Sequence, residues 1–91
     1  MRHAQEIHME ERRCAMRRAN AIQDAELKSF CEWYLQRFKA NPTNVRWFAV
    51  SLEGAMKCPH REVKDLLKRM QASGMIECYR DVVEIFKVKE D

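Results

Sequence analysis

A single glycine separates a helical spacing of apolar side chains from a strand-like one, and this boundary restricts the fold more than any other feature. Before Gly74 the apolar residues recur at intervals of three and four, which places them on one face of a helix. These residues are Val63, Leu66, Leu67 and Met70. After Gly74, the runs MIECY and VVEIFKV are typical of two strands joined at Arg80-Asp81. We therefore predict a helix over 59–73, ended by glycine at C′, and then a β-hairpin.

A second amphipathic helix is predicted from the segment AELKSFCEWYLQRF. Its apolar side chains also recur at spacings of three and four, which is typical of a helix with a wide buried face. Asp24 is a suitable N-cap, and Asn41 is kept out of the helical region by the proline that follows it. These limits predict a helix over about 25–40.

The segment VRWFAV, residues 45–50, is β-branched and aromatic, and we interpret it as a short strand. Because side chains alternate along a strand, one of Trp47 and Phe48 is expected to face outward. Ser51 has the side chain of an N-cap, so we predict that a helix of about two turns begins there and covers 52–57.

The remaining N-terminal part differs in composition from the body. Residues 1–20 are polar and rich in Arg, Glu and Ala, and we expect a helical extension that is weakly held to a domain of residues 21–91. A chain of 91 residues supports one compact core. Arginines at 12, 13, 17 and 18 leave three interpretations open for the extension: a phosphate-contacting arm, a dimerisation helix or a solvated segment.

Composition excludes several classes of protein. The first residues have no apolar signal-peptide region, and no apolar stretch is long enough to span a bilayer, so we expect a soluble, cytoplasmic protein. The four cysteines form no C-x-x-C pair, which favours reduced thiols that fill the core, most clearly Cys31. No phosphate loop or nucleophile motif occurs, so neither enzymatic activity nor a cofactor is expected.

Two sets of side chains were weighed as metal sites, and neither has the paired spacing of zinc modules, so no bound metal is expected. The sets are His3, His8 and Cys14, and Cys58, His60 and Cys78.

Charge is unevenly distributed, although the net charge is only +3. Residues 57–69 hold five basic and two acidic side chains, whereas residues 76–91 hold three basic and five acidic ones. The total charge therefore makes no case for a polyanionic partner, but a basic helix face does. The alternative is that this basic helix face is solvated and has no partner.

The stretch SLEGAMKCPHREVKDLLKRMQASGMIE resembles the winged helix-turn-helix superfamily of DNA-binding proteins. The resemblance lies in a capping serine, a small residue in the first helix of the pair, a short turn, an apolar-spaced second helix, and a glycine that opens the wing. These positions are Ser51, Ala55, Pro59, Val63, Leu67, Met70, Gly74, Met75 and Ile76. The resemblance implies an α+β, mainly helical domain with a small antiparallel sheet, preceded here by an extra N-terminal helix.

The resemblance also implies that helix 59–73 enters the major groove of double-stranded DNA. His60, Arg61 and Lys64 would lie nearest the bases, Asp65 and Lys68 would flank them, and Ser51 would anchor a phosphate. Two further basic candidates for DNA contact are Arg69 and Arg80. The expected function is sequence-specific DNA binding by a homodimeric transcriptional regulator of prokaryotic or phage origin.

The wing departs from this pattern, because its short tip has an acidic residue and its strands carry Glu77 and Glu84. An alternative therefore stays open. The domain would then be a protein interaction module that meets its partner through the hairpin, through Trp47 or Phe48, or through the N-terminal helix.

Overall fold

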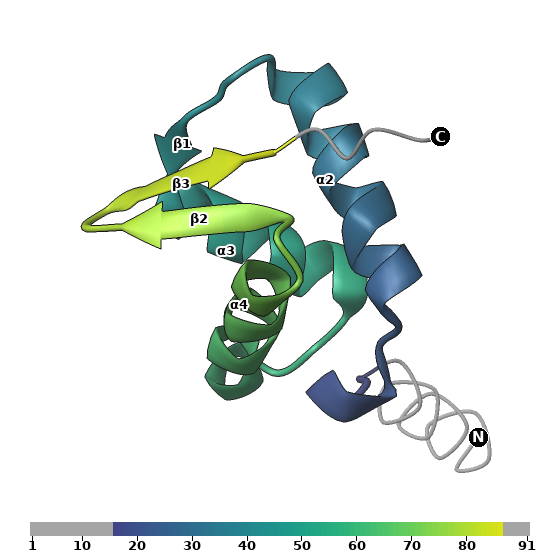
Figure 1. The fold of residues 1–91 in the computed structure, drawn as a ribbon. Helices are drawn as coiled ribbons and strands as arrows, with labels where there is room; N and C mark the ends of the chain where they lie inside the picture. The colour runs from purple at the N-terminus through teal and green to yellow at the C-terminus, as the bar shows by residue number, and fades with distance from the viewer. Residues whose placement is uncertain (1–15, 87–91) are drawn as a thin grey trace, which may run out of the picture.

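The computed structural model describes residues 16–86 and has an α+β fold that is mainly helical (Figure 1). In this range three α-helices accompany a three-stranded antiparallel sheet of order β1-β3-β2. The elements in chain order are η1 (Ala19–Ala21), α2 (Asp24–Phe38), β1 (Thr43–Asn44), α3 (Val45–Met56), η2 (His60–Glu62), α4 (Val63–Ala72), β2 (Ile76–Tyr79) and β3 (Val82–Ile85). In Figure 1 the β2–β3 hairpin projects to one side, and α2 lies on the opposite side. The general fold class predicted from the sequence is thus confirmed.

Helix α2 follows the predicted apolar stripe, and its N-cap is one residue earlier than expected. Gln23, not Asp24, is the cap, because a capping box forms in which the Gln23 amide donates to Glu26 at 3.1 Å. The buried stripe of α2 consists of Leu27, Phe30, Cys31 and Tyr34. The Tyr34 hydroxyl lies 2.9 Å from Oγ1 of Thr43 in a buried hydrogen bond, which fixes α2 against β1.

The predicted strand over 45–50 is wrong, because these residues form the first half of α3. Oδ1 of Asn44 accepts hydrogen bonds from the amides of Arg46 at 2.9 Å and Trp47 at 3.3 Å, so the helix begins at Val45. Burial at four-residue spacing then decides the conformation against the β propensity of this stretch. The buried side chains are Phe48, Leu52 and Met56. Trp47 faces outward and Phe48 inward, but this follows from their positions on a helix and not from the predicted alternation along a strand.

The predicted turn and second helix are confirmed in outline. The turn begins as the 3₁₀ turn η2 after Pro59, and α4 continues from it. Gly74 adopts φ 79° and closes the helix in a Schellman motif. In this motif the Gly74 amide donates to the Gln71 carbonyl at 3.0 Å, and the Met75 amide donates to the Met70 carbonyl at 2.9 Å.

The β-hairpin is also confirmed, with Arg80 and Asp81 at its tip. Val83 of β3 is the centre of the sheet, since it pairs with Cys78 of β2 on one side and Thr43 of β1 on the other. Arg80 has φ 59°, the left-handed conformation that a two-residue hairpin turn requires.

One core joins these elements, and its largest fully buried side chain is Phe48. The centroid of the Phe48 ring lies 5.3 Å from that of the Phe30 ring and 5.1 Å from that of the Tyr34 ring, and both pairs have edge-to-face geometry. Cys31 and Cys58 are buried and Cys78 is half-buried, all as free thiols, which confirms Cys31 as a core residue. Burial raises the pKa of the Cys31 thiol to about 12.

The segment just before α2 is held to the body by several bonds. The Arg17 amide donates to the Lys57 carbonyl at 2.7 Å, and the side chains of Ala19 and Ile22 are buried. The weak attachment expected for residues 1–20 is therefore not seen over residues 17–20. Residues 1–15, and with them most of the expected N-terminal helix, lie outside the described residues. No helix within residues 16–86 is long and apolar enough to cross a membrane.

Candidate nucleic-acid interface

The exposed side of α4, with the turn before it, carries a row of basic side chains. Arg61, Lys64 and Lys68 recur at intervals of three and four residues and are all exposed. None of the three makes a hydrogen bond or ion pair within residues 16–86. Asp65 lies on the same exposed side, while the opposite face of the helix is in the core. The structure thus brings together four of the residues that the sequence predicted for DNA contact.

His60 lies at the start of this row and is exposed, but it already has a partner. Its Nδ1 lies 2.9 Å from Oε1 of Glu53 on α3. His60 also belongs to η2 rather than to α4, so it extends the row from the preceding turn with a side chain that already contacts the protein.

Arg69 is not part of the exposed row, contrary to the sequence-based prediction. Its guanidinium donates to the carbonyl of Ala19 at 2.8 Å, to the carbonyl of Ile22, and to Oδ1 of Asp24 at 2.8 Å. These three acceptors lie in η1 and at the start of α2, so Arg69 attaches that segment to α4. A guanidinium with five donors in a fixed fork suits this structural role.

The phosphate anchor predicted at Ser51 is also wrong. Ser51 is half-buried in the middle of α3, where no helix begins. The first amides of α3 have protein acceptors instead: Val45 donates to the Asp81 carbonyl at 2.8 Å, and the next two donate to Asn44. A helix N-terminus binds an anion through free amides, and here they are occupied.

Arg80 lies at the hairpin tip, beside the acidic Asp81. In Figure 1 this tip projects to one side of the fold, away from α4. Behind the tip, Glu77 and Glu84 occupy directly opposed positions of β2 and β3. Like charges facing each other across a strand pair repel a phosphate backbone rather than attract it. Between α4 and the hairpin, the better candidate for contact with a polyanion is therefore α4 with its turn, and Arg80 is an isolated cation at the tip.

Glu62, the last residue of η2, is a buried carboxylate that joins the turn before α4 to the segment around Ala19. Oε1 of Glu62 accepts a hydrogen bond from the Ala19 amide at 2.8 Å. Oε2 is buried without an aligned hydrogen bond, and its charge is balanced by Arg18, whose Nε lies 2.6 Å away. The Ala19 amide and Arg18 hold the pKa of Glu62 below its usual 4.5, against the opposing effect of burial. No local pattern marks Glu62, because its partner lies 43 residues earlier in the chain.

Neutralising Glu62 is expected to change how stability depends on pH. Because the folded-state pKa is lowered, the carboxylate stabilises the fold above its unfolded-state pKa, and this contribution is lost as pH falls through the folded value. Glu62→Gln should therefore be less stable than the parent at neutral pH, and the two should converge in acid. Urea unfolding at a series of pH values measures this. Glu77→Gln, which alters an exposed carboxylate, is the control. Equal pH dependence in parent and Glu62→Gln would contradict the assignment.

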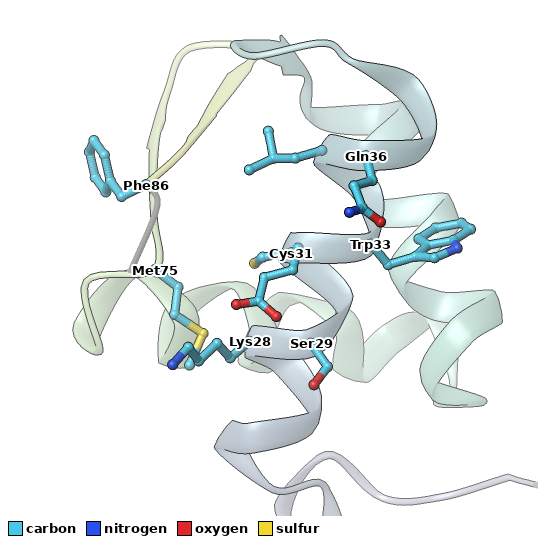
Figure 2. Close-up of a pocket in the computed structure, with 9 residues that line it drawn as sticks. Lys28, Ser29, Cys31, Trp33, Gln36, Met75 and Phe86 are labelled. Carbon is cyan, nitrogen blue, oxygen red and sulfur yellow. The ribbon is translucent and has the colours of Figure 1, made fainter. Parts of the chain in front are cut away.

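Two hollows flank α2, on the other side of the molecule from the hairpin tip. One, of about 610 Å³, lies between α2 and the residues that bracket the hairpin, Met75 and Phe86 (Figure 2). The other, of about 450 Å³, lies between α2 and the end of α3. Among residues 16–86 no group of three or more His, Cys, Asp or Glu side chains is placed to hold a metal ion.

Comparison with known proteins adds no assignment to this geometry: no family, no curated protein and no solved structure matches the chain.

Proposed function

We propose that the chain is a winged helix protein that binds double-stranded DNA through α4 and regulates transcription as a homodimer in the cytoplasm. The order of elements supports the winged helix: a helix, a short strand, two helices joined by a turn, and a hairpin. The sheet order β1-β3-β2, in which the first strand pairs with the last, agrees with that topology.

The observation that carries the proposal is the basic row on the exposed side of α4. An α-helix fits the major groove, and Arg or Lys on its outer face can reach guanine edges or phosphates. Arg61, Lys64 and Lys68 are exposed and form no ion pair within residues 16–86, although the charge of Arg61 acts on its neighbour Glu62, so binding DNA breaks no existing ion pair. Asp65 on the same side accepts hydrogen bonds and suits the amino group of cytosine.

The proposal is tested by selecting bound duplexes from a random pool and then measuring affinity for the enriched site against salt concentration. Lys64→Gln/Lys68→Gln is expected to weaken binding by roughly tenfold or more and to reduce the slope of log affinity against log salt by about 2. Both effects follow from the loss of two cations that release counterions from the phosphates.

Lys39→Gln/Arg46→Gln is the matched control, since it removes the same charge from two exposed side chains, one just after α2 and one in the first turn of α3, that belong neither to α4 nor to the outer face of α2. It should leave the affinity within about twofold, apart from a small loss of long-range attraction. No enrichment of any duplex, or equal losses in the two double variants, would contradict DNA binding through α4.

The alternative function, a protein interaction module, is favoured by one observation near the acidic wing. Trp47 is 70% exposed at the start of α3, beside Asp81 at the hairpin tip. An exposed tryptophan next to carboxylates suits a protein surface better than a phosphate backbone. Binding of a protein there would persist at high salt and be lost in Trp47→Ala, whereas binding of DNA through α4 would show the opposite behaviour.

A further inference from the structure

The outer side of α2 carries a stripe of four exposed side chains, of which one is charged. Ala25, Ser29, Trp33 and Arg37 recur every four residues and are all exposed. The stripe therefore runs from small side chains at the start of the helix to a large aromatic one and then a cation. Trp33 is 47% exposed, although it is one of the largest apolar side chains of the domain.

Trp33 stands next to space that it does not fill. Together with Ser29 it lines both hollows that flank α2. In Figure 2 its indole points away from Met75 and Phe86. The smaller hollow is lined by the small residues Ala25, Ser29 and Ala55, by Phe30 and Met56, and by Glu26 and Trp33 itself; most of its exposed lining is apolar. The Trp33 ring packs on Phe30 and Phe38 of its own helix and is still half exposed, and it lies one helical turn from the recess that this hollow forms beside Ser29 on the same face.

This arrangement is self-complementary under a two-fold axis. When two copies of α2 pack antiparallel with Trp33 opposite the partner's Ser29, symmetry also sets Ser29 opposite the partner's Trp33. Each ring then enters the other copy's recess. The same register sets Arg37 opposite the partner's Ala25, between two carboxylates, Asp24 and Glu26.

The charges at the ends of the helix agree with the antiparallel direction. The first turn of α2 is acidic and its last turn is basic, so each acidic turn meets a basic one. Arg69 binds only Oδ1 of Asp24, whose side chain is 61% exposed, so Arg37 of the other copy has an acceptor there. Glu26 is already bound to Arg17, and Trp33 therefore contributes more to the contact than Arg37 does.

We propose that the outer face of α2 is the homodimer interface of this protein, formed by antiparallel packing in which each Trp33 occupies the hollow beside Ser29 of the second copy. The proposal refines the homodimer that forms part of the proposed function. It does not require α4 to contact DNA, since the residues of the proposed contact lie on α2 and at the end of α3 and none belongs to α4.

Sedimentation equilibrium of the full chain without DNA, over a wide range of concentration, tests the interface. Trp33→Ala is expected to raise the dimer dissociation constant about a hundredfold, because each dimer loses two central aromatic anchors. Ser29→Lys should have a comparable effect by placing a charge in the recess. Because Ser29 is exposed on a helix and lysine is a good helix former, this variant keeps the monomer folded.

Trp47→Ala is the matched control, as it removes an even more exposed tryptophan from another helix and should leave the dimer intact. Circular dichroism of each variant checks that it is folded. A parent chain that sediments as a monomer at every concentration would overturn the proposal. A dimer that persists in both Trp33→Ala and Ser29→Lys would overturn it as well. Loss of DNA binding in α4 variants that still dimerise would bear only on the DNA site.

Discussion

Replacing Phe48 by alanine is expected to lower the free energy of unfolding by about 3–5 kcal/mol, the usual range for removing a fully buried aromatic ring. The Phe48 side chain has no exposed surface, and its ring packs edge-to-face on Phe30 and Tyr34, so the substitution leaves a cavity where α2 and α3 meet. A loss of this size is a large fraction of the stability of a small domain. Urea unfolding followed by circular dichroism measures it.

Two neighbours of Phe48 serve as controls, and they also separate a helix from a strand over residues 45–50. Trp47 is 70% exposed and Val50 is 56% exposed, so alanine at either position should change the stability by no more than about 0.5 kcal/mol. In a strand, Val50 would lie on the same side as Phe48 and be buried with it. If Val50→Ala lowered the free energy of unfolding as much as Phe48→Ala does, the result would therefore contradict a helix over residues 45–50.

Replacing Arg69 by methionine is expected to destabilise the fold by about 2–3 kcal/mol, since hydrogen bonds to a charged donor are among the stronger ones. The substitution keeps an unbranched side chain but leaves the carbonyls of Ala19 and Ile22 without their donor. The ion pair with Asp24 is largely exposed and adds little. Thermal and urea unfolding of the variant give the change in stability.

Lys68→Met is the control for Arg69→Met, because it removes the adjacent positive charge of α4 from an exposed side chain that has no partner within residues 16–86. It should leave stability nearly unchanged. In a DNA-binding assay the relative effects of the two variants reverse. Lys68→Met should weaken binding directly, and Arg69→Met should weaken it only by unfolding the protein. An Arg69→Met protein of full stability that no longer binds DNA would restore Arg69 as a DNA contact.

The adjacent residues Lys68 and Arg69 show how far the candidate site could be predicted from the sequence. Helical periodicity places Lys64 and Lys68 on the exposed side of α4, and both are found there. Arg69 lies near the edge of the apolar stripe, and periodicity does not reveal whether such a side chain meets solvent or protein. Its acceptors lie 45 to 50 residues away in the chain, so only the packing of η1 and α2 against α4 reveals its role.

By itself the sequence determined the elements whose signals are local. The apolar spacing from Val63 to Met70, the left-handed position of Gly74 and the two-residue hairpin tip depend on interactions within a few residues. Tertiary structure decided residues 45–50, where β-branched and aromatic side chains favour a strand locally. The Asn44 cap, the bond from Val45 to the hairpin tip, and burial of Phe48 against α2 outweigh that preference. The Asn44 cap is local, but the bond from Val45 to Asp81 and the packing of Phe48 on Phe30 join segments distant in sequence. The free energy of these two contacts is therefore absent from any local pattern.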